Sequence, residues 1–430
     1  MSRLDVHLHV PRVGVLERVE QSRLRFTYRG EPEALRGLPP LSLSLPLRRE
    51  PFSDEECRGF FSGLLPEGGF LRAVARAFGV SASNPFAVLE AIGGECAGAI
   101  SLAPPGAGPP SPREPWWPSP FELVDVLQRS PGRVLQAGVG DHGEGLRLSL
   151  AGAQDKLPVV FAEGRIGITR GNPPSTHIVK LPIEGFPDTV ANEQLCLALA
   201  RAGGLDAAEA VARRADGEQA KGPHLRYLLV TRYDRRAEPP ARLHQEDVCQ
   251  ALGVPPELKY QAEGGPTVAD CASLIARHSA VPARDRLAFA DALIFNLLIG
   301  NHDAHAKNYS LMLEGPDAPR LAPLYDLLST SVYPDLSRKL AMKLGGENRP
   351  VYIRGRHLDR LAGELNMRPR AFRRRAADLA ARVTAALPEV AERLATNFDH
   401  PSTLQHITDQ VQAAARRLRS ALAEPSSPGS

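Results

Sequence analysis

The sequence predicts a mixed α+β fold in which a β-rich part is followed by an α-rich part. Residues 3 to 29 alternate between polar and apolar side chains, which is the period of half-buried strands in hairpins. Short apolar runs bounded by turn residues continue this β-rich character to about residue 244. From residue 245 to Ala423 nearly all of the chain is expected to be helical.

The chain is expected to divide into five segments. The first is a small α+β domain with helices at Pro51 to Leu65, Gly69 to Phe78 and Phe86 to Ile92, and Ser83-Asn84-Pro85 caps the last of these. The segments are residues 1–103 (the α+β domain), 104–120 (a linker or long loop), 121–244 (a β-rich lobe), 245–423 (an α-helical lobe) and 424–430 (a disordered tail).

The linker is dense in proline and glycine, which excludes a packed helix or strand interior. Its Trp116 and Trp117 are expected to pin it onto a neighbouring surface. In the β-rich lobe a helix is expected at Thr189 to Ala202. Strands are expected at Leu146 to Leu150, Leu157 to Phe161, His177 to Leu181 and Leu225 to Thr231.

The composition excludes several classes of protein. The 430 residues are 43% hydrophobic and 23% charged, the balance of an ordinary soluble protein, and no transmembrane run is expected. The start, MSRLDVHLHV, lacks the apolar region and cleavage site of a signal peptide. Five scattered cysteines, never spaced C-x-x-C, predict neither a disulfide framework nor a structural zinc site, so the expected compartment is the cytoplasm.

The net charge of +3 does not indicate a dedicated nucleic-acid binder. Positive charge is nevertheless concentrated between Met367 and Arg375. This segment is either the solvated face of a helix or a patch that contacts phosphate groups. Its cations are Arg368, Arg370, Arg373, Arg374 and Arg375.

The segment IGNHDAHAKNYSLML, residues 299–313, carries the strongest chemical signal. Asp303 and Asn308 are spaced D-x-x-x-x-N after an apolar helix. Phosphoryl transfer uses a carboxylate to accept the proton of the attacking hydroxyl, and a nearby oxygen ligand for Mg²⁺. The alternative is an ordinary turn rich in Asn and Asp. His302 and His305 lack a third ligand at zinc spacing and are expected to orient the loop by hydrogen bonds.

One further carboxylate, Asp326, lies in the apolar run LAPLYDLLST. A charge in such a run is costly unless it is paired or bound to a metal. Asp326 follows the strand after Asn308, where kinases place their second Mg²⁺ ligand. The alternative is that Asp326 caps a helix beginning at Leu327.

Two segments upstream are suited to binding phosphate. Lys180 ends a short apolar strand, where a kinase holds the lysine that contacts ATP phosphates, although a strand lysine is often simply exposed. The turn Ala151-Gly152-Ala153-Gln154 has backbone N–H groups available for phosphate, or it is a plain hairpin. Gly138, Gly140 and Gly143 spell G-x-G-x-x-G without the flanking strand and helix of a dinucleotide fold.

These signals follow one another in the order found in kinases. The phosphate turn, the lysine strand, the D-x-x-x-x-N loop and the acidic metal ligand span about 180 residues. Together the motifs SLAGAQDK, THIVKLP, RYDRR, LHQEDVCQALGVPPELKY, NHDAHAKNYS and LAPLYDLLS resemble HipA-type kinases. FFSGLLPEG and LEAIGGECAGAISL resemble the N-terminal region of that family, and the resemblance covers roughly residues 1 to 400.

The resemblance implies a bilobal protein-kinase-like fold, with a β-rich N-lobe, an extra N-terminal α+β domain and an all-α C-lobe. It implies a toxin kinase that transfers phosphate from ATP to protein serine or threonine with Mg²⁺. Asp303 would be the catalytic base, Asn308 and Asp326 would hold Mg²⁺, and Lys180 would contact the ATP phosphates.

The same resemblance assigns the remaining nucleotide site. Ser149 matches the autophosphorylated serine of the family, and Ala151, Gly152, Ala153 and Gln154 form the turn beside it. Thr231 and Tyr233 fall at the adenine-facing hinge, where the family usually has Glu in place of Thr231. His305 and Lys307 would support the nucleotide.

The resemblance also implies partners. In the family a helix-turn-helix antitoxin of the HipB type binds the kinase, the complex sits on its own operator DNA, and the N-terminal domain contributes to the contact. Some members modify aminoacyl-tRNA synthetases. Two alternatives are a lipid-type kinase, which would need a membrane-directed surface, and a catalytically silent corepressor, which would need a broken active site.

Overall fold

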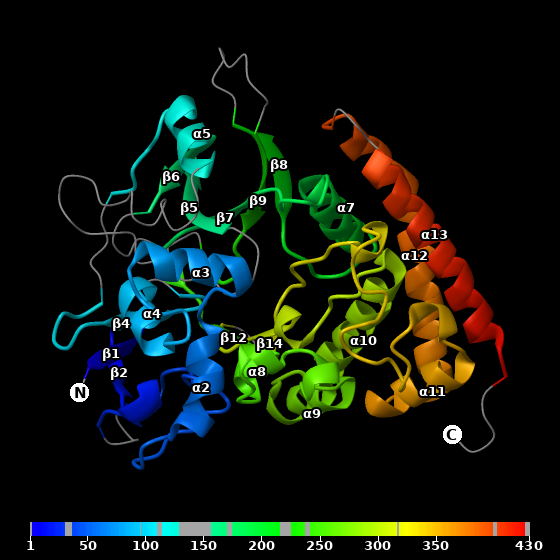
Figure 1. The fold of residues 1–430 in the computed structure, drawn as a ribbon. Coiled ribbons are helices and arrows are strands. Elements are labelled where there is room, and N and C mark those ends of the chain that lie inside the picture. The colour runs from blue at the N-terminus through cyan, green and yellow to red at the C-terminus, as the bar shows by residue number, and fades with distance from the viewer. Residues whose placement is uncertain are drawn as a thin grey trace. The chain divides into compact units, whose positions relative to one another are not determined.

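The computed structural model describes residues 2–30, 37–94, 96–109, 114–128, 156–169, 174–215, 225–236, 241–315, 318–398 and 402–425. Ser149, the turn 151–154, the strand expected at 146–150, Gly138, Gly140, Gly143 and residues 426–430 lie outside these ranges. The chain forms two compact units (Figure 1). Unit one comprises Met1–Leu181, Arg213–Pro256 and Met312–Pro316, and unit two comprises Pro182–Ala212, Glu257–Leu311 and Asp317–Ser430.

Unit one contains an antiparallel sheet in the order β3-β2-β1-β4. The hairpins expected in residues 3 to 29 are confirmed, because β1 pairs with β2 and β2 with β3. Alternate residues of β3 are buried, as the two-residue period predicts. The strands are β1 (Arg3–Leu8), β2 (Arg12–Arg18), β3 (Leu24–Tyr28) and β4 (Ile100–Ala103).

The three helices expected in this region are also confirmed. They are α2 (Asp54–Gly63), α3 (Gly68–Ala77) and α4 (Pro85–Ile92). Ser53 and Glu56 form a capping box at the start of α2, and the Asn84 side chain accepts a hydrogen bond of 3.2 Å from the Ala87 N–H in α4. These caps satisfy N–H groups that a helix start leaves without partners.

A second sheet, whose strands other than β8 lie wholly in unit one, has the order β6-β5-β7-β9-β8. β6, β5, β7 and β9 form successive antiparallel pairs, and Lys180 of β7 lies between Lys156 and Leu228. The backbones of Trp116 and Ile168 exchange two hydrogen bonds, so the tryptophan segment is pinned to β6 as expected. The elements are α5 (Pro120–Gln128), β5 (Lys156–Ala162), β6 (Arg165–Ile168), β7 (His177–Lys180), β8 (Ala210–Arg214) and β9 (Arg226–Thr231).

Two glycines allow a close approach between α2 and the short helix α8 (Val248–Ala251) of unit one. Gly253 follows α8 with φ +70°, a left-handed conformation that glycine adopts without strain. A Cβ on Gly59 of α2 would lie 2.3 Å from the Gly253 carbonyl oxygen. Because any side chain here would overlap that oxygen, α2 and α8 can lie this close together only with glycine at position 59.

Unit two is mostly helical. The helix expected at Thr189 to Ala202 is confirmed, and α12 packs against α7, α10, α11 and α13. Figure 1 shows α12 and α13 side by side. The helices are α7 (Thr189–Ala202), α9 (Val268–His278), α10 (Pro282–Ile299), α11 (Gly355–Glu364), α12 (Pro369–Ala395) and α13 (Ser402–Ala423).

The arginine-rich stretch Met367 to Arg375 contributes to this packing. Arg373 makes two hydrogen bonds to the Asp359 carboxylate, at 2.7 and 2.8 Å, and Arg375 contacts the Asp291 carboxylate at 2.6 and 2.7 Å. Paired contacts of this kind are the strongest that an arginine makes with a carboxylate. Arg373 and Arg375 are therefore structural residues of α12.

The prediction of an all-α region from residue 245 to 423 is wrong. β12 (Gln245–Asp247) and β14 (Arg320–Leu321) interrupt it, whereas β13 (Ser310–Met312) is the strand expected after Asn308. Residues 322–354 contain 3-10 turns, isolated β-bridges and irregular backbone. This stretch contains three Pro, three Ser and two Gly residues, whose backbone and side-chain preferences favour turns over helix. Among the described residues, no helix is long and apolar enough to cross a membrane.

We predict that Gly59→Ala lowers the stability of the protein by about 1–3 kcal/mol, because the new methyl group would overlap the Gly253 backbone. Gly69→Ala is the matched control. Gly69 is also helical, its Cβ would meet nothing closer than 3.9 Å, and alanine is the better helix former by up to about 1 kcal/mol. Thermal unfolding of the three proteins checks this, and equal melting temperatures for Gly59→Ala and the parent would contradict it.

Candidate active site

The loop that contains Asp303 begins where α10 ends. Gly300 adopts φ +70°, and a Cβ at this position would lie 2.1 Å from the Ser331 hydroxyl oxygen. The Gly300 carbonyl accepts hydrogen bonds from the Ser331 N–H at 3.0 Å and from the Thr330 hydroxyl at 3.2 Å. Only glycine combines this left-handed turn with such close neighbours. The turn fixes the direction in which the chain leaves α10.

Asparagine side chains then hold the loop in shape. Asn301 donates to the Asn296 side-chain oxygen at 2.9 Å, and its own oxygen accepts from the Asp303 N–H at 3.1 Å. Asn296 in turn donates to the Ala292 carbonyl and the Tyr309 hydroxyl. Asn296 and Asn301 are buried, whereas Asp303 is exposed. The two buried asparagines therefore form a fixed support from which the Asp303 carboxylate faces solvent.

Tyr260 contacts this carboxylate directly. Its hydroxyl donates a hydrogen bond of 2.8 Å to Asp303 Oδ1, and its ring meets the His305 ring edge to face at 5.3 Å. Sequence reasoning did not assign Tyr260 a role. It ends the motif LHQEDVCQALGVPPELKY, but nothing in its spacing indicates contact with a loop 43 residues further on.

His302 also helps to hold the loop in shape. The expectation that His302 orients the loop is confirmed, because its Nδ1 lies 3.1 Å from the Ser337 carbonyl oxygen and its own carbonyl accepts from the Ala341 N–H at 2.8 Å. Burial lowers the pKa of His302, and the charge of Arg338 lowers it further. In the described ranges, no third His, Cys, Asp or Glu joins these residues in a metal-binding group.

Asn308 ends the 3-10 helix η4 (Ala306–Asn308). It is 8% exposed, and within the described part of the chain its side-chain amide makes no hydrogen bond. The turn around it is fixed, since the Tyr325 hydroxyl donates to the Lys307 carbonyl at 2.7 Å and contacts the Ser310 hydroxyl at 2.7 Å.

Asp326 does not cap a helix. No helix begins at Leu327, where the residues that follow are irregular, so that alternative is wrong. Asp326 instead adopts φ +56°. A left-handed conformation at a residue other than glycine costs about 1–3 kcal/mol and tends to occur at functional sites. The strain is consistent with selection for a carboxylate at this position.

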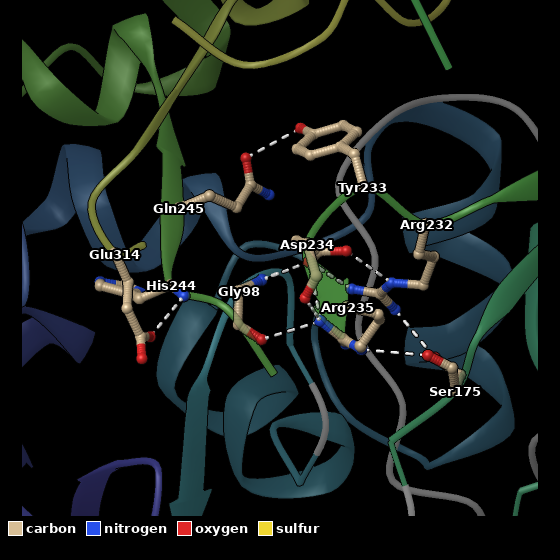
Figure 2. Close-up of polar contacts among 9 residues, drawn as sticks. All are labelled: Gly98, Ser175, Arg232, Tyr233, Asp234, Arg235, His244, Gln245 and Glu314. Carbon is tan, nitrogen blue, oxygen red and sulfur yellow. Dashed lines mark hydrogen bonds and ion pairs between the residues drawn. The ribbon is translucent and has the colours of Figure 1, made fainter. Parts of the chain in front are cut away.

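The remaining expected site residues belong to unit one. Lys180 is 7% exposed at the end of β7, and Thr231 ends β9 opposite His177. The Tyr233 hydroxyl donates a hydrogen bond of 2.9 Å to Gln245 (Figure 2). Unit two holds Asp303, His305, Lys307, Asn308 and Asp326, while Ser149 and residues 151–154 lie outside the described residues.

Beside Tyr233 lies a buried ion-pair network that the sequence analysis missed (Figure 2). The guanidinium of Arg232 contacts both carboxylate oxygens of Asp234, at 2.9 and 2.7 Å, and Arg235 approaches one of them at 2.9 Å. The Gly98 N–H donates to the same carboxylate, and both arginines also bind Ser175. Burial alone would raise the pKa of Asp234, but the two arginines outweigh it and the pKa lies well below its usual range.

Further buried polar contacts are made by the motif LHQEDVCQALGVPPELKY, which contains His244. The Glu314 carboxylate accepts one hydrogen bond of 3.1 Å from the His244 backbone N–H, and it lies 2.8 Å from His9 Nε2. Two residues beyond His244, the Glu246 carboxyl is fully buried against the Ser42 hydroxyl at 2.5 Å and the Leu43 N–H at 2.8 Å. Burial raises the pKa of Glu246 to about 8. These contacts fix the start of α8 against the residues before α2.

Two family descriptions match the chain. Residues 4–103 match the HipA N-terminal domain, and residues 148–387 match the HipA-like C-terminal domain. The second match alone covers more than half of the chain and includes every loop residue described above. The chain belongs to the HipA family.

Individual relatives agree with this assignment. The protein named "Putative kinase Y4mE" from Sinorhizobium fredii is 43% identical over 388 residues, which are 88% of this chain and 90% of that protein. The serine/threonine-protein kinase toxin HipA from Shewanella oneidensis is 32% identical over 396 residues, 88% of this chain and 87% of that one. These names support a kinase.

A solved structure also has this fold. It is described as the toxin–antitoxin complex of HipA, HipB and operator DNA from Shewanella oneidensis. The match has a TM-score of 0.82 at 27% identity, and covers 97% of this chain and 98% of the other. The similarity therefore extends over both units of the HipA-family fold.

We predict that Glu246→Gln removes a pH dependence of stability. The carboxyl ionises near pH 4.5 in the unfolded chain and near pH 8 in the folded protein. Between these values the folded state binds more protons than the unfolded state, so the free energy of unfolding falls as the pH rises. The effect should amount to a few kcal/mol, and Gln keeps a hydrogen bond to both Leu43 and Ser42.

Melting temperatures from pH 5 to pH 8 check this. The parent should lose stability across that range and Glu246→Gln should lose less, so that the variant is the more stable protein at pH 8. Parallel curves for the two proteins would contradict the prediction.

Proposed function

We propose that this HipA-family chain is an ATP- and Mg²⁺-dependent serine/threonine protein kinase toxin of a type II toxin–antitoxin module. The observation that carries the proposal is the exposed Asp303 carboxylate on a loop fixed by buried asparagines. A general base must be held in place and must also reach its substrate. The Shewanella relative, named a serine/threonine-protein kinase toxin, supports a kinase of this class.

In this proposal Asp303 accepts the proton of a serine or threonine hydroxyl. The hydroxyl oxygen forms a bond to the γ-phosphorus of ATP while the bond from that phosphorus to the oxygen of ADP breaks. Tyr260 fixes the orientation of the carboxylate through Oδ1, and Asn301 fixes the backbone of Asp303. Both are positioning residues.

The residues present fit a magnesium ion. Asn308 offers an amide oxygen that no described residue engages, and Asp326 offers a carboxylate held in a strained backbone. Such oxygen ligands are the type that Mg²⁺ prefers. When bound, the ion would neutralise charge on the phosphates of ATP, and Asn308 and Asp326 would hold it there.

The residues proposed to bind ATP are those that the family resemblance assigns. Lys180 and the backbone of residues 151–154 would contact its phosphates, Thr231 and Tyr233 would face adenine, and His305 and Lys307 would support it. Ser149 is proposed as the site of autophosphorylation that inactivates the kinase. A phosphoserine carries about −1.5 to −2 charge, which would compete with ATP for the same N–H groups.

The proposed partners follow from the relatives. The complex of the Shewanella protein with HipB and operator DNA supports a helix-turn-helix antitoxin as partner, with DNA bound through it. We propose that the kinase acts on a protein that growth requires, an aminoacyl-tRNA synthetase being one candidate class.

We predict that Asp303→Asn lowers phosphate transfer by about 10²–10⁴-fold while ATP still binds, because only the proton acceptor is removed. Transfer of radiolabelled phosphate to protein, together with mass spectrometry of Ser149, measures the first effect, and calorimetry with ATP measures the second. Asp378→Asn, at an exposed position of α12, is the control and should match the parent. Transfer by Asp303→Asn at the parent rate would mean that another group is the base.

We predict that Tyr260→Phe lowers kcat by roughly tenfold and leaves the KM for ATP unchanged. The ring keeps its packing against His305, while the carboxylate loses a hydrogen bond whose removal costs about 1.5–3 kcal/mol. Steady-state kinetics and an unchanged melting temperature are the measurements. A rise in the KM for ATP with constant kcat would assign Tyr260 to nucleotide binding instead.

A further inference from the structure

Positive charge is concentrated in the segment Leu336–Arg356 of unit two, named here the basic segment. It holds six cations and one carboxylate, although the whole chain carries a net charge of only +3. All six cations are exposed, and the carboxylate, Glu347, lies 3.3 Å from the guanidinium of Arg349. The cations are Arg338, Lys339, Lys343, Arg349, Arg354 and Arg356.

The basic segment is bound to the loop of Asp303. The Ala341 N–H donates to the His302 carbonyl at 2.8 Å, and the Ser337 carbonyl lies 3.1 Å from His302 Nδ1. On its other side, the Gln261 N–H donates to the Ala341 carbonyl at 3.2 Å. The first three cations of the segment therefore border the residues that adjoin Asp303 and Tyr260.

Hydrogen bonds also hold two of these cations, Arg338 and Lys343, near the loop. The Lys343 N–H donates to the Gln261 side chain at 2.7 Å, and the Arg338 guanidinium donates to the Ser331 carbonyl beside Gly300. The charge of Arg338 reaches His302, since it lowers the pKa of that residue in addition to burial. By contrast, the turns around Tyr260 carry the exposed acids Glu257 and Glu263. The excess positive charge thus belongs to the basic segment.

Two large apolar side chains are exposed in the same segment. Val351 is 54% exposed and Tyr352 is 50% exposed, and the Arg349 guanidinium lies over the Tyr352 ring at 4.3 Å. Exposed apolar residues among charges are typical of surfaces that bind another protein. A phosphodiester backbone would gain nothing from Val351.

We infer that the basic segment is the docking surface for the protein substrate, and that it selects acidic residues beside the serine or threonine to be phosphorylated. The inference rests on the proposed role of Asp303. A hydroxyl that reaches Asp303 belongs to a chain whose neighbouring residues can contact the basic segment beside it. Cations there attract carboxylates and disfavour other cations.

The test uses two labelled peptides that share a central serine, one flanked by glutamates and the other by glutamines. The full-length protein should bind the glutamate peptide more tightly. Lys339→Glu with Lys343→Glu should weaken that binding about threefold to thirtyfold, because each exposed charge pair contributes modestly. The same double variant should leave the affinity for the glutamine peptide unchanged, and added salt should weaken only the glutamate peptide.

Arg370→Glu with Arg374→Glu is the matched control, since both arginines are exposed on α12 and the change in net charge is the same. The inference is overturned if this control weakens the glutamate peptide equally, if the parent shows no preference, or if it binds neither peptide. It is also overturned if the first double variant loses binding of a random single-stranded RNA but not of the peptide. If the parent protein itself neither phosphorylates Ser149 nor turns over ATP, the proposed function is contradicted instead.

Discussion

The left-handed turn at Gly300 is the constraint on which the loop depends. Because the backbone there comes within van der Waals contact of Ser331, the segments around residues 300 and 330 can approach only if position 300 has no side chain. The Asn301 side chain then fixes the backbone of Asp303, because it hydrogen-bonds to the Asn296 side chain and to the Asp303 N–H. A loop held by buried amides loses little further entropy when a substrate binds.

Unit two supplies the framework for this loop through α12. Arg375 of α12 binds Asp291 of α10, and Arg373 binds Asp359 of α11. Buried carboxylates of this kind must keep their partners, since a charge left alone in the interior costs several kcal/mol. These pairs specify how α12 lies on its neighbours, and the apolar residues between them supply most of the packing.

Much of the fold could be predicted from the sequence, because hydrophobic periodicity and helix caps depend on residues that are close together in the chain. The hairpins of residues 3 to 29 and the helices α2, α3, α4 and α7 follow directly from spacing and capping residues. Residues 322–354 were mistaken for helix because their order comes from contacts with distant residues, such as Ala341 with His302. The Tyr260–Asp303 contact was missed for the same reason, as were the contacts of Gly98 and Ser175 with the ion pairs around Asp234: they join residues that are far apart in the sequence. The conformation of Asp326 is likewise set by its surroundings and by no local motif.

The packing of α12 and α13 has a consequence for the order of synthesis. Helix α10 and the loop after it leave the ribosome before the arginines that bind α10 and α11, and before Gln410, which lies close to Gly300. A nascent chain that has produced Asp303 still lacks the helices that bury the preceding helix. The loop therefore gains its full framework only after residues 369–423 have been translated and folded.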